Sequence, residues 1–318
     1  MTAPPEVLWD LLADAARRAP ERLAVTRGDE RWTWAELERH ARGAATLLEA
    51  QGVRPGDRVA LLHESSPWGI AAFWGAQCVG AETVDVPSHA APDTIHAALA
   101  ECGARAVVLD GAQARRLDRA QLPAIVVGSR ASGFEGPAAL EDAAPSTRAA
   151  ARPSHEAVAL TLYTSGTSGR PKGVMLTHHN LLSNVVAARE LSRTPEGASL
   201  LLVVPLYFVH GRMQLLSFTL AAGTLHLSQG FMFPERVLDE LVATGATHLS
   251  GVPYHFTTLM DRTTLGSRPL PQLTDVLITG GALPPAALKR LASKLPGVHL
   301  HTAYGMTEAS PRVTYLGP

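Results

Sequence analysis

The chain alternates short apolar runs with longer stretches in which apolar side chains recur every third or fourth position. The recurring pattern predicts helices, because residues three and four apart share one helix face. We expect helices at residues 6–18, 34–49, 68–79, 180–191, 214–221, 234–243, 253–261 and 284–295. The short apolar runs predict strands at residues 59–62, 106–109, 125–127, 160–163, 200–204, 224–227, 276–278 and 298–301.

Strands that alternate with helices predict an α/β fold, in which mostly parallel sheets are covered by helices on both faces. We expect a first α/β region over residues 1–156, whose last part from residue 128 is a surface connection rich in Ala, Pro, Ser and Gly. A second region should cover residues 157–318 and hold the phosphate loop and an acid pocket. Ligand sites in such folds gather at the carboxyl ends of the strands.

The amino-acid composition limits the possible partners and the cellular location. The 318 residues are 46% hydrophobic, enough to build a packed core. Lys and Arg number 28 against 29 Asp and Glu, so neither nucleic acid nor an anionic membrane is indicated as a partner. Cys78 and Cys102 have no metal or redox spacing. The N-terminus lacks the features of a signal peptide, and the longest apolar region, 69–81, is too short to span a bilayer. We therefore expect a cytoplasmic location.

The most informative stretch is residues 160–174, LTLYTSGTSGRPKGV. A buried strand leads into a turn of Thr, Ser and Gly, whose backbone N–H groups can converge on an anion, above all a polyphosphate. Lys172 adds a full positive charge, and Pro171 restricts the backbone just before it. The motif is not the Walker loop, which needs Gly-Lys-Ser/Thr in succession, because Gly169 is followed by Arg170.

A second polar constellation lies at residues 301–310, HTAYGMTEAS, after a predicted strand. The Tyr304 ring can stack on a nucleobase, and Gly305 lets the backbone approach a ligand closely. Thr307 can donate to a phosphate, and Glu308 is a hard oxygen ligand of the kind that Mg²⁺ prefers.

These two stretches resemble the phosphate-binding loop and the Tyr-Gly-x-Thr-Glu motif of the adenylate-forming superfamily, which includes acyl-CoA synthetases, peptide-synthetase adenylation domains and luciferases. Residues 277–284, LITGGALP, are similar to the family's Gly-Gly-Ala turn beside the adenylate and acyl group. The resemblance implies catalytic roles for Lys172, Thr307 and Glu308, with Glu308 as the metal ligand. It implies nucleotide binding by Thr164, Ser165, Gly166, Thr167, Ser168, Gly169, Lys172, Gly281, Ala282, Thr302, Ala303, Tyr304, Gly305 and Thr307.

Residues 204–211, VPLYFVHG, are similar to the family segment that borders the acid pocket, but with departures. Phe208 stands where many relatives have His, and His210 stands where plant aryl-CoA ligases have a pocket Tyr. Arg212 replaces a usual apolar residue, and we expect it to face solvent or else a second polar group of the acid. The resemblance implies an acid pocket formed by Tyr207, Phe208, His210, Gly211, Tyr254, Gly280, Gly281 and Met306.

As a member of this family, the parent enzyme would use ATP and Mg²⁺ to convert a carboxylic acid to an acyl-adenylate with release of pyrophosphate. Transfer to CoA or to the phosphopantetheine of a carrier protein would follow. The family's Thr-Gly-Asp segment and small C-terminal lid domain are not found, so we expect an N-terminal fragment with little activity of its own.

Three alternatives remain open at this stage. The first is an enzyme that stops at the adenylate or loads only a carrier protein. The second is a phosphotransferase, which would instead release ADP. The third is a nucleotide-binding module without catalytic activity.

Overall fold

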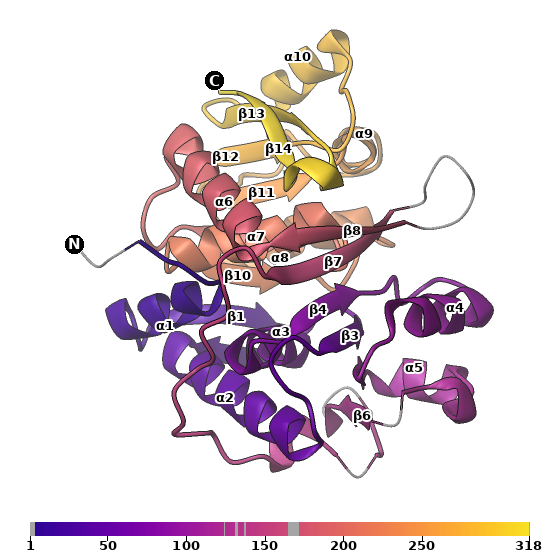
Figure 1. Cartoon of the computed structure of the whole chain (residues 1–318). Helices are drawn as coiled ribbons and strands as arrows, with labels where there is room; N and C mark the ends of the chain where they lie inside the picture. Colours follow the sequence, from indigo (N-terminus) through magenta and orange to yellow (C-terminus); the bar gives the residue numbers. More distant parts are fainter. Residues whose placement is uncertain (1–3, 124, 131–132, 137, 165–171, 318) are drawn as a thin grey trace. The chain divides into compact units, whose positions relative to one another are not determined.

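The computed structural model describes residues 4–123, 125–130, 133–136, 138–164 and 172–317. It contains two compact units (Figure 1). The first comprises Met1–Pro20 and Trp34–Ser183, and the second comprises Glu21–Thr33 and Asn184–Pro318. This division differs from the expected boundary after residue 156, because two early strands belong to the second unit's sheet and the phosphate-loop strands belong to the first unit's.

The first unit is built on a six-stranded sheet with the order β6-β5-β3-β4-β7-β8. All neighbouring strands are parallel except the antiparallel pair β7 and β8, in which Thr164 lies opposite Lys172. The strands are β3 (Arg58–Leu62), β4 (Glu82–Asp85), β5 (Ala106–Leu109), β6 (Ile125–Gly128), β7 (Val158–Thr164) and β8 (Lys172–Thr177).

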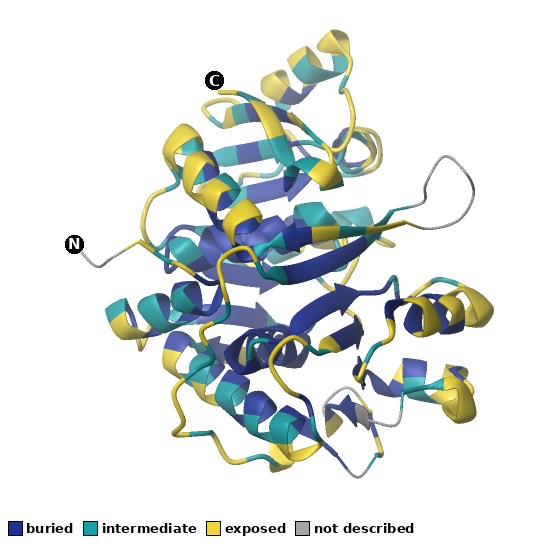
Figure 2. Ribbon diagram, viewed as in Figure 1, coloured by how far each residue is buried: buried dark blue, intermediate teal, exposed yellow. Residues whose placement is uncertain are grey.

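Helix α3 forms the centre of the first unit. It is buried along its whole length, packs against α2, β3 and β4, and begins where the Ser66 side chain accepts a hydrogen bond from the backbone N–H of Gly69 (Figure 2). The helices of this unit are α1 (Trp9–Arg18), α2 (Trp34–Ala50), α3 (Pro67–Val79), α4 (Pro92–Cys102), α5 (Gly111–Arg116) and the short 3₁₀ turns η1 (Arg119–Gln121) and η3 (Leu140–Asp142).

The second unit is built on an eight-stranded sheet with the order β14-β13-β12-β11-β9-β10-β1-β2. The six inner strands are parallel, and an antiparallel strand closes each edge. The strands are β1 (Leu23–Arg27), β2 (Glu30–Thr33), β9 (Ser199–Leu202), β10 (Thr224–Leu227), β11 (His248–Gly251), β12 (Asp275–Ile278), β13 (His299–Gly305) and β14 (Arg312–Leu316).

Helix α7 packs against β9 and β10 and is buried from Gly211 to Thr219. The expectation that Arg212 faces solvent is therefore wrong: its side chain is 1% exposed, because α7 presents no face to water at that position. The helices of this unit are α7 (Val209–Leu220), α8 (Pro234–Thr244), α9 (Pro253–Arg262), α10 (Pro285–Lys294) and the 3₁₀ turn η4 (Thr307–Ala309). Helix α6 (His178–Ser192) begins in the first unit and ends in the second.

The α/β fold with mostly parallel sheets is confirmed, but several element boundaries differ from expectation. Helix α7 begins at Val209 rather than residue 214, so His210 and Gly211 lie in its first turn. Strand β13 continues to Gly305, so Tyr304 lies within the strand rather than after it. Among the described residues, no helix is both long and apolar enough to cross a membrane.

Candidate functional site

The two ends of the predicted phosphate loop are held together by the β7–β8 pair. Thr164 is the last residue of β7, and its hydroxyl lies 3.5 Å from the backbone oxygen of Lys172, the first residue of β8. The Lys172 side chain is exposed, and its role in phosphate binding stays a prediction. The other predicted loop residues, Ser165, Gly166, Thr167, Ser168 and Gly169, lie outside the described residues.

Two further predicted segments meet at the carboxyl edge of the second sheet. Ile278 of β12 pairs with Thr302 of β13, so Gly280 and Tyr304 follow two residues later at the same edge. Gly280 has φ +79°, a left-handed conformation that favours glycine, and a side chain there would press against Val252. The turn at Gly280 and Gly281 thus packs against Val252 and Pro253, which follow β11, and Gly281 and Ala282 are exposed.

The turn from β13 to β14 presents the Tyr304–Glu308 segment outward. Gly305 is required there, since a Cβ at this position would lie 1.7 Å from the backbone oxygen of Pro311. Asn184 fixes the other side of the turn by donating to the backbone oxygen of Arg312 at 2.9 Å. On this support the Tyr304 ring is 62% exposed, and the Glu308 carboxylate is also exposed, with no ion pair to any described residue.

Exposure of these groups fits the predicted ligands. An exposed aromatic face can stack on adenine, an unpaired carboxylate can bind Mg²⁺, and Thr307 lies partly exposed between them in the chain. Thr302 and Ala303 precede them in β13, where Ala303 is buried. One other group suited to a metal exists among the described residues, formed by the exposed His155, Glu156 and His179 of the first unit, which sequence analysis did not predict.

The predicted acid-pocket segment forms the junction between β9 and α7. Gly211 lies so close to Pro205 that a Cβ would be 2.3 Å from its backbone oxygen. The rings of Tyr207 and Phe208 are 4.6 Å apart, and Phe208 is 49% exposed. Tyr254 and Met306 are also exposed, at 65% and 47%. Their role in substrate binding stays a prediction.

His210 is the exception in this segment, because it lies inside the unit and forms a polar network. Its Nε2 is 2.7 Å from the hydroxyl of Ser250, which also accepts a hydrogen bond from Gln214 at 3.2 Å. Burial, and then the charge of Arg312, lower the pKa of His210 to about 3. The imidazole is therefore neutral at physiological pH, and its buried Nδ1 has no hydrogen-bond partner among the described residues.

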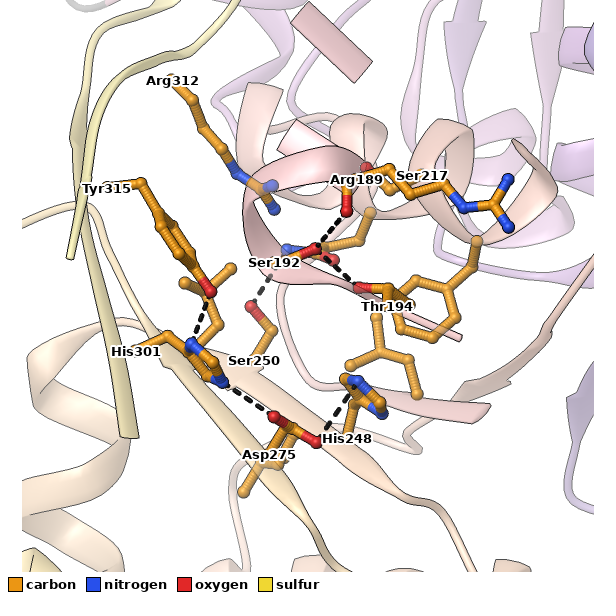
Figure 3. Close-up of a pocket in the computed structure, with 15 residues that line it drawn as sticks. Arg189, Ser192, Thr194, Ser217, His248, Ser250, Asp275, His301, Arg312 and Tyr315 are labelled. Atoms are coloured by element: carbon orange, nitrogen blue, oxygen red, sulfur yellow. Dashed lines mark hydrogen bonds and ion pairs between the residues drawn. The ribbon is translucent and has the colours of Figure 1, made fainter. Parts of the chain in front are cut away.

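A pocket within the second unit lies beside this network (Figure 3). It contains none of the eight residues predicted for the acid pocket, although all eight are described. The lining combines polar residues from α6, α7, β11, β12, β13 and β14 with apolar ones: Arg189, Ser192, Thr194, Leu200, Gln214, Ser217, Phe218, His248, Leu249, Ser250, Asp275, Leu277, His301, Arg312 and Tyr315.

Asp275 anchors one end of the pocket. His301 donates from Nε2 to this carboxylate at 2.7 Å and accepts at Nδ1 from the hydroxyl of Tyr315. Burial raises the pKa of Asp275, but the hydrogen bonds from Thr274 and His301 outweigh it, and the net pKa is lowered. The carboxylate is therefore ionised and already accepts hydrogen bonds from Thr274 and His301. His248 lies 3.7 Å from its other oxygen, and Figure 3 draws both histidines with dashed lines to Asp275.

Sequence analysis missed this pocket for a simple reason. His301 belongs to a stretch that the motif search singled out, but Arg312 and Tyr315 acquire their positions only through the pairing of β14 with β13. The available signal was an apolar-polar alternation in residues 312–316, which a period-two search would assign to an edge strand.

Comparison with known proteins identifies the class. The chain matches the AMP-binding enzyme family over residues 12–318 and belongs to that family. A feruloyl-CoA synthase from an Amycolatopsis species is 31% identical over 302 residues, which cover 95% of this chain. A linear gramicidin synthase of Brevibacillus parabrevis is 27% identical over 308 residues, covering 96% of this chain and 6% of that protein.

The fold comparison agrees. The N-terminal domain of FACL13 from Mycobacterium tuberculosis has a TM-score of 0.88 and 23% identity, over 98% of this chain and 78% of that one. The predicted family and the predicted fold class are thereby confirmed. The chain spans 59% of the length of the feruloyl-CoA synthase that it matches.

Proposed function

We propose that the protein activates a carboxylic acid with ATP to give an acyl-adenylate and pyrophosphate, and then transfers the acyl group to a thiol. The observation that carries this proposal is the exposed Tyr304–Glu308 turn at the carboxyl edge of the sheet, in a chain that belongs to the AMP-binding family. The thiol is that of CoA or of a carrier-protein phosphopantetheine; both a CoA ligase and a peptide synthetase are among the relatives.

The chemistry assigns a task to each group. A carboxylate oxygen attacks the α-phosphorus of ATP, the bond from that phosphorus to the bridging oxygen breaks, and pyrophosphate leaves. Negative charge develops on phosphoryl oxygens, so fixed donors that meet it in the transition state lower the barrier. Lys172 holds the β- and γ-phosphates, and the Thr307 hydroxyl donates to the α-phosphate. Tyr304 stacks on adenine, and the backbone at Gly280 and Gly281 borders the acyl group.

Mg²⁺ would be held by Glu308, whose carboxylate is exposed and outside any described ion pair. When bound, the ion shares its positive charge with the phosphate oxygens. The protein's own part is to hold this carboxylate in a fixed turn, which Gly305 and Asn184 define.

Measuring the products of the full-length protein tests the proposal. Incubation with ATP, Mg²⁺ and a panel of acids should release pyrophosphate and AMP, with an acid-dependent exchange of labelled pyrophosphate into ATP. Formation of ADP and a phosphorylated acid, with no pyrophosphate, would instead identify a phosphotransferase. ATP binding without turnover of any acid would identify a nucleotide-binding module without catalytic activity.

A further inference from the structure

The pocket of the second unit contains a cation that the described residues leave without a partner. Arg312 is the first residue of β14 and is half-buried, and its guanidinium forms no hydrogen bond or ion pair with any residue that the structure describes. Figure 3 shows the side chain extending from β14 into the pocket, with no dashed line to the other residues drawn. Burial lowers the pKa of Arg312 from its usual range, although the group stays charged.

The other charged groups of the pocket are already engaged. Asp275 accepts from His301, and the Arg189 guanidinium donates to the backbone oxygen of Leu220 at 3.0 Å. Adjacent His210 is neutral, because burial lowers its pKa to about 3. The lining therefore has two guanidinium groups against one carboxylate, and the half-buried Arg312 guanidinium has no partner among the described residues. Removing a cation from water without a partner is costly.

The ligand that would complete this arrangement has a single negative charge. Apolar side chains (Leu200, Phe218, Leu249, Leu277) make up a large part of the lining, and one of its two guanidinium groups, that of Arg312, has no described partner, which suits a monoanion better than a phosphate dianion. A carboxylate can bind the guanidinium through two parallel hydrogen bonds. The hydroxyls of Ser250 and Tyr315 lie in the same lining but already bond to His210 and His301, so the Arg312 guanidinium is the donor that remains for such a carboxylate.

The place of Arg312 relates the pocket to the reaction. In the β13–β14 pair, Arg312 lies opposite Gly305, at the sheet edge that carries Tyr304 and Thr307. From there the lining continues along β12 and β13 to Leu277 and His301, away from the exposed turn. An acyl chain bound at the edge can thus extend into the pocket past Arg312.

We propose that the acid activated by this protein carries a second carboxylate, remote from the reacting one, and that Arg312 selects it by binding that carboxylate in the pocket. This inference rests on the proposed acid activation and adds the substrate class to it.

The test compares acids that differ only in the remote charge. Pyrophosphate exchange by the full-length protein is measured with the α,ω-dicarboxylic acids of four to eight carbons and with the monomethyl ester of each. The ester keeps the chain but removes the second negative charge. We expect the best diacid to exceed its ester in kcat/KM by roughly 10- to 150-fold, the range of a hydrogen bond to a charged group.

Three variants locate the preference. Arg312→Met should reduce the diacid-to-ester ratio to about one, and Arg312→Lys should give an intermediate ratio, because it keeps the charge but not the bidentate geometry. Arg290→Met is the matched control: this exposed arginine of the same unit pairs with Asp261 outside the pocket, so the ratio should stay at the wild-type value.

The outcomes separate the inference from the function. A wild-type preference for esters, or for acids with a remote amine, overturns the inference while leaving acid activation intact. An equal fall in kcat/KM for all acids in Arg312→Met also overturns the inference, because Arg312 would then hold the reacting carboxylate or the nucleotide. If no acid supports exchange, the proposed function fails. Calorimetry of the 318-residue chain with the same diacids and esters then decides the inference: Arg312-dependent binding of diacids supports it, and equal or absent binding rejects it.

Discussion

At the scale of single residues, Lys172 is the exposed cation that opens β8 at the end of the predicted phosphate loop. Replacing Lys172 with Ala should slow adenylate formation roughly 30- to 1000-fold, because the lost charge acts on the departing pyrophosphate. Lys289→Ala, an exposed lysine of α10, is the control and should behave as wild type. Undiminished pyrophosphate exchange by Lys172→Ala would remove this lysine from the mechanism.

Glu308 provides a second test at this scale. Its carboxylate is exposed in η4 and supports no core contact, so Glu308→Gln should leave the melting temperature within about a degree of the wild-type value. The Mg²⁺ concentration for half-maximal exchange should rise, since an amide is a weaker ligand than a carboxylate. A large fall in melting temperature together with an unchanged Mg²⁺ requirement would show that Glu308 is structural instead.

These residues could be proposed from the sequence alone because their chemistry lies in consecutive positions, and their roles stay predictions. A Thr/Ser/Gly turn that ends in Pro-Lys-Gly, or a Tyr-Gly-x-Thr-Glu segment, identifies itself without knowledge of the fold. Arg212 and Arg312 show the limit. An arginine is ordinarily expected in water, yet Arg212 is buried in α7 and Arg312 faces a pocket. Their positions depend on the packing of neighbouring elements, which no local pattern encodes.

At the scale of elements, the β13–β14 turn depends on one glycine. Gly305→Ala would force a Cβ to within 1.7 Å of the Pro311 oxygen, so the turn must open. We expect a loss of about 1–3 kcal/mol in the free energy of unfolding, as for other overpacked sites. Adenylation should fall as well, because Tyr304 and Thr307 lie on the same turn.

The matched control for this turn is Gly317→Ala. A Cβ at Gly317 would meet only the edge of the Tyr315 ring at 3.6 Å, an ordinary contact. Thermal unfolding of the two variants should therefore differ, with Gly317→Ala close to wild type. Equal melting temperatures would mean that the turn adjusts to the added methyl group without strain.

Elements with a clear period were predictable, and those defined by their partners were not. The apolar faces of α1, α8 and α9 repeat with helical spacing, and the predicted ranges agree with the structure to within a few residues. Strand β8 was missed because its residues Lys172–Thr177 begin in a motif that had been assigned to the loop. Strand β1 pairs with β10, for example Val25 with Leu225, and such a long-range pair leaves no local trace.

At the scale of the whole molecule, the chain contributes strands to one sheet, then to the other, and then to the first again. A single boundary along the sequence cannot describe this alternation. The chain enters the second unit for β1 and β2, returns to build the first, and enters the second again within α6. Each unit thus combines two separate segments of the chain, so neither is a contiguous piece of sequence. A boundary predicted from composition, such as residue 156, marks only a change in surface character.

Buried histidines distributed over both units predict how the stability of the whole chain depends on pH. Burial lowers the pKa of His178 in the first unit and of His226 in the second to about 4, from the ordinary 6.5. Between these values the unfolded chain binds more protons than the folded one, so stability falls as the pH drops from about 6.5 towards 4. Above that window these groups contribute no pH dependence. The carboxylate of Asp275 affects stability only at a lower pH, because its pKa in the folded protein lies below the ordinary value of 3.8.

Replacing one of these histidines isolates its share of the effect. The ring of His226 lies 2.8 Å from the Thr26 hydroxyl, and Gln can keep a hydrogen bond there without titrating. Melting temperatures of wild type and His226→Gln should run parallel from pH 8 to 7, and below about pH 6.5 the wild-type curve should fall more steeply than that of the variant. The substitution should remove the share of His226 from the slope of the free energy of unfolding against pH. That share is at most one proton, about 1.4 kcal/mol per pH unit. His89→Gln, at an exposed position, should follow the wild-type curve throughout. Parallel curves for His226→Gln down to pH 4.5 would mean that the pKa of His226 is the same in the folded and the unfolded chain.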